Sequence, residues 1–237
     1  MRIPAAIRIV RPHNALVAGI AALLGFLIAT GSVTSPSLIL AVTVALITAA
    51  GNVINDICDV EIDRINRPDR PISSGEISRR GASLYATILF AAGIGSASLT
   101  TSLCLLIAII NSVILIAYAV WLKRIPLLGN IAVAYLTGSI FLFGGAFVGI
   151  EGLTRNISIA VITFLATLAR EILKDAEDMD GDAIGGAHTL PMIIGIRGTG
   201  VVALTCACGA VVTSLLPIGD WWSPFYLIAI GAVDLII

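Results

Sequence analysis

Long hydrophobic runs alternate with short polar segments along most of the chain. Eight apolar segments can be drawn, approximately at 14–31, 36–55, 82–100, 102–121, 130–150, 156–174, 198–216 and 222–237. Most of them approach the roughly 20 residues that a helix needs to cross the hydrocarbon core of a bilayer. Helices suit this environment because they satisfy their backbone polar groups internally. The pattern therefore predicts an all-α integral membrane protein, a bundle of eight visible transmembrane helices.

The composition agrees with this class of protein. Hydrophobic residues make up 58% of the 237 residues, charged residues make up 12%, and the mean hydropathy is +1.03. Soluble domains carry about twice that share of charged residues. We therefore expect the membrane bilayer, and no nucleic acid, as a partner.

The connections between the apolar segments differ in length and charge. Most are short turns, such as 151–156, whereas those at about 56–81 and 175–197 are longer and begin with acidic residues. Eleven of the 14 basic residues fall on the side of the N-terminus: Arg2, Arg8, Arg11, Arg64, Arg67, Arg70, Arg79, Arg80, Lys123, Arg124 and Arg197. The positive-inside rule makes this side cytoplasmic. We expect a multi-pass protein of the cell membrane whose acidic stretches face the cytoplasm.

The acidic residues of the two long connections repeat at one spacing. Adding 119 to the numbers of the first four gives the second four: Asp56, Asp59, Glu61 and Asp63, then Asp175, Asp178, Asp180 and Asp182. Each stretch follows the second span of a four-span block, which predicts two parallel four-helix repeats, about 1–122 and 123–237, around a central cavity. Together they form one transmembrane domain, 1–237. The apolar ending 234–237 indicates either a very short terminus or a missing C-terminal helix, and Asp234 in it is either functional or an artefact of the chain end.

Residues four and seven apart share one face of a helix, so each acidic stretch predicts a stripe of oxygen donors. The stripes consist of Asn52, Asn55, Asp56, Asp59 and Asp63, and of Glu171, Asp175, Asp178 and Asp182. Carboxylates with a neighbouring amide suit Mg²⁺, which is held by few carboxylates together with waters and phosphates. A solvated acidic helix end is the alternative reading.

Basic residues on the same side of the membrane extend this site. Arg67, Arg70, Lys123 and Arg124 match phosphate oxygens, Arg as a fork and Lys as a point charge. Carboxylates, Mg²⁺ and these cations together predict a diphosphate site at the mouth of an apolar cavity. A cation transporter is the alternative from another class, but it predicts carboxylates near mid-membrane, whereas these lie at the ends of spans.

Three motifs resemble one family. The stretch 55–63 followed by Asn66-Arg67-Pro68-Asp69-Arg70-Pro71 resembles the first aspartate-rich motif of the UbiA superfamily of intramembrane prenyltransferases. The stretch 174–182 is similar to its second motif, and Tyr118 to Asn130 resembles the segment after its fourth helix. The stretch 170–182 with Thr189-Leu190-Pro191 looks most like the archaeal branch that makes digeranylgeranylglyceryl phosphate.

The resemblance implies a fold of nine helices, of which eight are visible here, and a Mg²⁺-dependent transfer. The donor would be an isoprenyl diphosphate, geranylgeranyl diphosphate on the branch reading, and the acceptor a lipid phosphate, the hydroxyl of geranylgeranylglyceryl phosphate. An aromatic acceptor, as for quinone, haem or chlorophyll-type products, is the alternative within the family. The allylic cation would be shielded from water by the apolar helices, and the acceptor hydroxyl would form an ether of the kind found in archaeal membrane lipids.

The resemblance also implies roles for individual residues. Mg²⁺ would be held by Asn55, Asp56, Asp59, Asp63, Asp175, Asp178 and Asp182. Catalytic roles would fall to Asp59, Asp63, Asp178, Asp182 and Lys123. Substrates would be bound by Asn14, Arg11, Arg67, Arg70, Tyr118, Arg124, Asn130 and Lys174. Arg11, Arg64, Arg70 and Arg124 are unranked candidates for the acceptor's phosphate, and Asn14 is equally well explained as a cap at the start of a helix.

Overall fold

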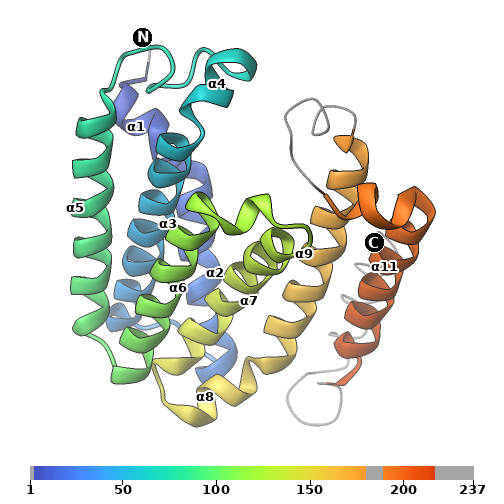
Figure 1. Cartoon of the computed structure of the whole chain (residues 1–237). Helices are drawn as coiled ribbons and strands as arrows, with labels where there is room; N and C mark the ends of the chain where they lie inside the picture. Colours follow the sequence, from blue (N-terminus) through green and yellow to red (C-terminus); the bar gives the residue numbers. More distant parts are fainter. Residues whose placement is uncertain (1–2, 180–188, 217–237) are drawn as a thin grey trace. The chain divides into compact units, whose positions relative to one another are not determined.

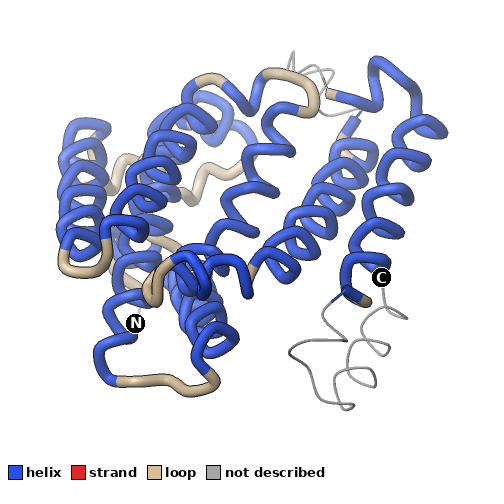
Figure 2. The backbone as a smooth tube through the Cα atoms, turned by 90° about the horizontal axis from the view of Figure 1, so that it is seen from below, coloured by secondary structure: helices blue, strands red, loops and turns tan. Residues whose placement is uncertain are grey.

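The computed structural model describes residues 3–179 and 189–216, and within these ranges it contains helices and no strands (Figures 1 and 2). The first unit of the chain holds α1 (Ala5–Ile9), α2 (Pro12–Thr30), η1 (Ser35–Ser37), α3 (Leu38–Cys58), α4 (Val60–Asn66), α5 (Arg79–Ser98) and α6 (Ser102–Val120). These are followed by η2 (Leu122–Arg124), α7 (Leu128–Ala146), α8 (Ile150–Arg155), α9 (Ile157–Glu177) and α11 (Leu190–Ser214). The all-α prediction is confirmed.

Six of the described helices are long and apolar enough to cross a membrane, namely α2, α3 with η1, α5, α6, α7 and α11. The predicted segment 156–174 forms α9, which is 21 residues long but carries Arg170, Glu171 and Lys174 in its last two turns. The segment 222–237, with Asp234, lies outside the described residues. The predicted turn at 151–156 was wrong, because α8 occupies most of it. The chain is a multi-pass membrane protein.

Local sequence signals set the ends of several helices. Gly31 ends α2 in the left-handed conformation, φ 77°, and its N–H donates to the carbonyl of Leu27 at 2.7 Å. The hydroxyl of Ser78 accepts from the N–H of Gly81 at 3.1 Å at the start of α5. The hydroxyl of Thr101 does the same for Cys104 at 3.2 Å at the start of α6. Such caps satisfy N–H groups that the helix itself leaves without a partner.

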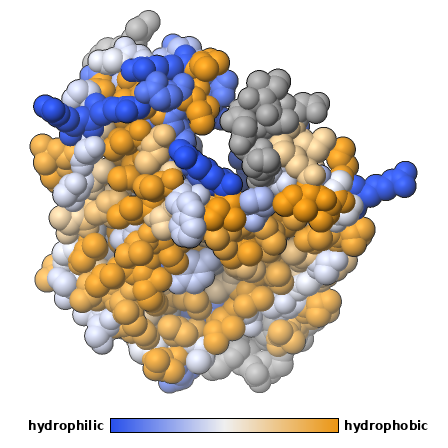
Figure 3. Space-filling model, viewed as in Figure 1, coloured by the Kyte–Doolittle hydropathy of each residue, from blue (hydrophilic) through white to orange (hydrophobic). Residues whose placement is uncertain are grey.

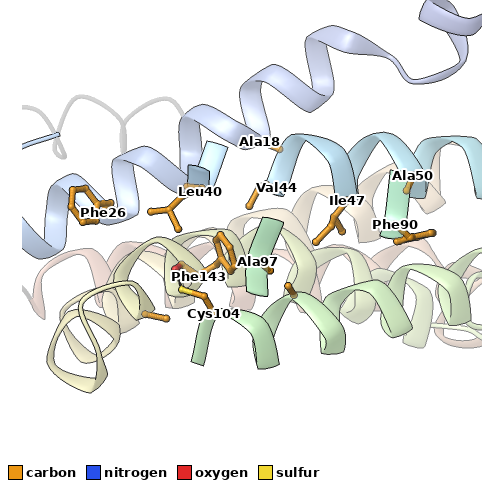
Figure 4. Packing of buried hydrophobic residues seen from close by; sticks show 13 residues of the cluster. Ala18, Phe26, Leu40, Val44, Ile47, Ala50, Phe90, Ala97, Cys104 and Phe143 are labelled. Carbon is orange, nitrogen blue, oxygen red and sulfur yellow. Dashed lines mark hydrogen bonds between the residues drawn. The ribbon is translucent and has the colours of Figure 1, made fainter. Parts of the chain in front are cut away.

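The chain divides into two compact units, of which the first comprises 1–121 and 139–156. In it α3 packs against α2, α5 and α6. The core of this unit combines small residues, mostly Ala, with large ones such as Phe26, Leu40 and Phe143 (Figure 4). Small side chains let helices in a membrane approach closely. Large apolar side chains such as Leu16, 63% exposed, lie on the outer surface, and the face seen in Figure 3 is largely hydrophobic.

The second unit comprises 122–138 and 157–237, so α7 contributes its first part to this unit and its last part to the first. Within it, α9 packs along α11. Ala134, Leu168, Ala169, Ile172, Leu190 and Ala203 form its buried core. Gly195 interrupts α11 with φ 74° and ψ 163°, and the hydroxyl of the buried Thr199 donates to its carbonyl at 2.9 Å.

Helices of the two units correspond at the same spacing as the acidic stretches. The bounds of α3, 38 and 58, become 157 and 177 when 119 is added, and these are the bounds of α9. A Cβ on Gly19 in α2 would lie 2.9 Å from the carbonyl oxygen of Ala41 in α3. A Cβ on Gly138 in α7 would lie 2.6 Å from that of Ala160 in α9, and 138 and 160 are 19 and 41 shifted by 119. Equivalent glycines therefore make equivalent helix contacts.

A second glycine contact, inside the first unit, joins α2 to the end of α7. A Cβ on Gly25 would lie 2.6 Å from the carbonyl oxygen of Phe141. A Cβ on Gly144 would lie 2.2 Å from the carbonyl oxygen of Ala22. Residues 22 and 25 become 141 and 144 when 119 is added, so the contact is reciprocal. Only glycine permits this backbone approach on both sides.

Candidate active site

The first acidic stretch lies where α3 meets α4, at the end of the unit that also carries α1 (Figure 1). The sequence predicts one continuous helical stripe here, but the helix breaks at Asp59, with φ −95° and ψ 2°. Asp favours helix ends because its short side chain competes for backbone partners. The N–H of Asp59 still donates to the carbonyl of Asn55 at 2.9 Å, and that of Asp63 to the carbonyl of Asp59 at 2.8 Å. The four-residue spacing of the stripe therefore survives the break.

Two carboxylates of this stretch are buried and paired with arginines. Oδ1 of Asp56 accepts from Nη2 of Arg11 at 2.5 Å and lies 3.1 Å from Nη1 of Arg70. The same Nη1 of Arg70 lies 2.5 Å from Oδ2 of Asp63. The side chains of Asp56 and Asp63 are only 3% and 8% exposed. We call Arg11, Asp56, Arg70 and Asp63 the buried ion-pair chain.

The other predicted residues of the first unit lie at or next to the ends of its helices. Asn55 and Asp59 are half-buried at the same helix junction, and Tyr118 is half-buried in the last turn of α6. Arg67 is exposed directly after α4, and its N–H donates to the carbonyl of Asp63 at 2.8 Å. Asn14 is exposed in the first turn of α2, and Arg11, not Asn14, occupies the N-cap. The alternative reading of Asn14 as a cap was therefore wrong.

A separate, solvent-facing group of charges lies beside the buried chain. Glu61 pairs with Arg64 at 2.8 Å and with Arg79 at 2.7 Å, and all three side chains are more than half exposed. In Figure 3 hydrophilic residues gather at this end of the first unit. Arg64 therefore belongs to a surface cluster, unlike Arg11 and Arg70.

In the second unit the basic loop folds back on itself. Lys123 is half-buried and Arg124 exposed in η2, and Leu127 takes the left-handed conformation at φ 64°. A Cβ on Gly129 would lie 3.0 Å from the Cα of Lys123, so the start of α7 is tight against the loop. The buried Asn130 donates through Nδ2 to Oδ2 of Asp175 in α9 at 2.9 Å. Two of the predicted residues, 45 positions apart, are thus brought together.

The remaining residues of the second stretch follow the end of α9. Lys174 is exposed and lies 3.9 Å from Oε2 of Glu171, which Arg170 also contacts at 2.8 Å. Asp178 is exposed just after the helix, and its N–H donates to the carbonyl of Lys174 at 2.9 Å. Asp182 lies outside the described residues.

These donors fit the chemistry of Mg²⁺ without forming a closed protein cage. Within 3–179 and 189–216, no three His, Cys, Asp or Glu side chains are grouped to hold a metal ion. The candidates in both stretches are carboxylate and amide oxygens, which Mg²⁺ prefers. Because Mg²⁺ usually keeps waters and takes one or two carboxylates plus substrate phosphates, a closed cage is not required.

The chain is similar to known proteins over nearly its whole length. The profile of the UbiA prenyltransferase family matches residues 18–237. The chain is 71% identical over 237 residues to digeranylgeranylglyceryl phosphate synthase from Methanoculleus marisnigri, covering 100% of this chain and 85% of that protein. It is 43% identical over 239 residues to the synthase of the same name from Thermococcus gammatolerans, covering 100% of this chain and 86% of that one.

Solved structures agree with the sequence comparison. A structure described as giving insights into digeranylgeranylglyceryl phosphate synthase in membranes superposes with a TM-score of 0.88 at 35% identity, over 98% of this chain and 83% of that one. A UbiA homologue from Archaeoglobus fulgidus, bound to GPP and Mg²⁺, shares the fold with a TM-score of 0.80 at 19% identity, over 98% and 84% of the two chains. The family match covers nearly the whole chain, which therefore belongs to the UbiA prenyltransferase family.

Proposed function

We propose that this protein transfers a geranylgeranyl group from geranylgeranyl diphosphate to the hydroxyl of geranylgeranylglyceryl phosphate, a step of archaeal ether-lipid synthesis. The observation that carries the proposal is the 71% identity, over the full chain, to a digeranylgeranylglyceryl phosphate synthase. The grouping of oxygen donors with arginines at one end of the first unit supports a substrate that carries phosphate groups.

In the proposed reaction, the bond between the allylic carbon and the diphosphate oxygen breaks. An ether bond to the glycerol oxygen forms, and diphosphate and a proton are released. Asn55, Asp59, Asp63, Asp175, Asp178 and Asp182 would hold Mg²⁺. When bound, Mg²⁺ neutralises charge on the departing diphosphate. Lys123, Arg67 and Lys174 would add fixed positive charge at the same leaving group, and such preorganised electrostatic stabilisation is usually the largest catalytic contribution.

The apolar helices have a chemical role as well as a structural one. An allylic cation reacts with water as readily as with an alcohol, so the reaction needs a site from which water is excluded. The first unit supplies packed helices with a core of Ala, Val, Leu and Phe below the polar junction of α3 and α4. We propose that these walls protect the cation until the acceptor hydroxyl attacks.

We also propose the finer architecture and the orientation. Two parallel four-helix repeats, about 1–122 and 123–237, would form one domain around a central cavity. The common spacing of 119 in the bounds of α3 and α9 and in two glycine contacts supports this repeat. The site would face the cytoplasm, which the distribution of lysine and arginine supports.

The test is product formation by the purified protein in detergent or lipid with Mg²⁺ and geranylgeranyl diphosphate. We expect an ether product with geranylgeranylglyceryl phosphate and none with 4-hydroxybenzoate as an aromatic acceptor. Product with the aromatic acceptor alone would replace the proposed acceptor while keeping the enzyme class. Cation flux through proteoliposomes that ignores diphosphate, with no product from either acceptor, would instead support a transporter.

A further inference from the structure

The buried ion-pair chain has an arrangement that a metal site alone does not explain. One carboxylate oxygen, Oδ1 of Asp56, contacts two guanidinium groups, at 2.5 Å from Arg11 and 3.1 Å from Arg70. The chain continues from Arg70 to Asp63 at 2.5 Å. These four residues come from the start of α2, the end of α3, α4 and the segment after α4, all within the first unit.

The burial of these ion pairs affects which ligands Asp56 can bind. The side chain of Asp56 is 3% exposed, and those of Arg70 and Arg11 are 18% and 26% exposed. Two positive and two negative groups balance within the chain. A buried carboxylate that already neutralises two cations is a poor ligand for a divalent cation, because the arginines repel the metal and occupy the same oxygen. The pairing therefore argues against Asp56 as a metal ligand.

The arginines, unlike Asp56, keep hydrogen-bonding capacity. The ion pairs involve Nη2 of Arg11 and Nη1 of Arg70, whereas each guanidinium has five N–H donors. Both side chains are partly exposed, so a ligand can reach them. Each guanidinium is a planar fork of donors of the kind that recognises phosphate, and two of them are held against one carboxylate oxygen.

The backbone fixes both arginines in place. Arg11 adopts the left-handed conformation, φ 49° and ψ 69°, at the N-cap of α2. Such a conformation in a non-glycine residue is strained and persists where surrounding contacts require it. The Nδ2 of Asn52 donates to the carbonyl of the preceding Val10 at 3.0 Å and so anchors this turn to α3. Two backbone hydrogen bonds hold Arg70 in a turn. The N–H of Arg70 donates to the carbonyl of Arg67 at 3.1 Å, and the carbonyl of Arg70 accepts from the N–H of Ser74 at 2.8 Å.

We propose that Asp56 is a positioning residue, not a metal ligand, and that it holds Arg11 and Arg70 together to bind a phosphate group of a substrate. The N-terminus of α2, at which Arg11 lies, adds favourable partial charge for an anion. Which phosphate is bound, that of the donor or that of the acceptor, rests on the proposed function, whereas the phosphate-binding role itself does not. The pairing ranks Arg11 and Arg70 above Arg64, whose partner is the exposed Glu61.

The first experiment needs no turnover. Binding of inorganic diphosphate to the whole purified chain is measured by calorimetry in EDTA, so that no divalent metal contributes. We expect Asp56→Asn to weaken binding about 10- to 100-fold, as loss of an orienting partner does at other sites. Glu61→Gln, the matched carboxylate-to-amide change in the exposed cluster, should leave it unchanged. Equal affinity of the wild type and Asp56→Asn, or no metal-free binding by the wild type, would overturn the proposal.

The second experiment distinguishes a positioning role of Asp56 from a role in metal binding. It uses a different variant, so the proposal can still be tested if Asp56→Asn does not fold. Asp56→Glu keeps the charge but moves the carboxylate, and its fold is checked by thermal unfolding. Positioning predicts a KM about tenfold higher for one phosphate-bearing substrate, with the Mg²⁺ concentration for half-maximal activity unchanged. The substrate whose KM rises identifies the bound phosphate. A shift in the Mg²⁺ midpoint with both KM values unchanged would restore Asp56 as a metal ligand.

The two proposals fail in different ways. If no ether product forms but diphosphate binding still depends on Asp56, the proposed acceptor is wrong and the positioning role stands. If product forms normally and neither binding nor KM depends on Asp56, the positioning role is wrong and the proposed function stands.

Discussion

In the first unit the carboxylate of Asp56 is paired with the guanidinium of Arg11, whereas in the second unit the carboxylate of Asp175 accepts a hydrogen bond from the amide of Asn130. Both members of the second pair are 119 positions beyond their counterparts, since 11 becomes 130 and 56 becomes 175. The start of the first helix of each proposed repeat thus contacts the end of its second helix in the same way. The contact is kept while the charge of one partner changes.

The same contact can serve different chemistry in the two units. Arg11 brings a positive charge to its carboxylate and presents further donors to an anion. Asn130 fixes the orientation of its carboxylate without adding charge, as amides do for the ligands of metal sites. We therefore propose that residue 56 serves phosphate binding in the first repeat and residue 175 serves metal binding in the second.

The largest effect is expected at equivalent carboxylates outside the buried ion-pair chain, Asp59 and Asp178, which are again 119 apart. Asp59→Ala and Asp178→Ala should each lower turnover about 10²- to 10³-fold, the size seen when one preorganised group at a developing charge is removed. Thermal unfolding should stay near that of the wild type, because Asp59 is half-buried and Asp178 exposed. Near-normal turnover of either variant would exclude that residue from the metal site, and unequal losses would show which repeat dominates.

The second prediction exchanges the partner of the first carboxylate. Arg11→Asn gives Asp56 an asparagine partner, the residue type that contacts Asp175 in the second unit. Arg70 then remains as the only cation of the buried ion-pair chain beside Asp56 and Asp63. We expect a loss of about 3 kcal/mol in the free energy of unfolding, because a buried charge loses compensation. Asn130→Ala should cost only about 1 kcal/mol, the size of one hydrogen bond. Denaturant unfolding in detergent measures both, and equal losses would mean that the two contacts are energetically alike.

The third prediction concerns the reciprocal glycine contact. Gly25→Ala and Gly144→Ala should each destabilise the protein by about 1–3 kcal/mol, because the new methyl group meets backbone atoms that cannot move aside. Gly95 in α5 is the control, since a Cβ there meets nothing within 4 Å. Gly95→Ala should be neutral or stabilising by up to about 1 kcal/mol through helix propensity. If Gly25→Ala and Gly144→Ala match this control, the close approach of α2 and α7 is wrong.

Much of the fold was predictable because its signals are local. In the part of the chain that the structure describes, seven of the predicted apolar segments appear as helices, and the eighth, 222–237, lies outside it. Hydrophobic length and polar interruptions define these segments within the sequence. The break at Asp59 and the short α8 were not predicted, because a helix and a turn of a few residues differ in packing more than in composition. The UbiA family assignment is confirmed, because its motifs combine several residue types at fixed spacing.

The partners inside the site were less predictable. Arg11 and Asp56 are 45 positions apart, and nothing in the local sequence states that the start of α2 reaches the end of α3. In the proposed repeat, position 130 corresponds to position 11, but the residues there, Asn and Arg, differ in type, so the sequence does not reveal the shared contact. The residue types alone predicted a metal role for Asp56 and a phosphate role for Arg70, and their contact is the reason for proposing a shared phosphate role instead.

The smallest effect is expected in the exposed cluster beside the buried ion-pair chain. Arg64→Gln removes one of the two arginine partners of Glu61, and the side chains of Arg64 and Glu61 are both at least 60% exposed. Surface ion pairs contribute about 0–1 kcal/mol and are screened by salt, so the loss should fall below about 1 kcal/mol and shrink further in high salt. Arg70→Gln leaves Asp56 with Arg11 and removes the arginine that pairs with Asp63. This change should cost several times more and keep most of that cost in salt, because buried pairs are less screened. Parallel unfolding at low and high salt makes the comparison. An equal salt response for the two variants would mean that water reaches Asp56, and the case for its positioning role would lose its physical basis.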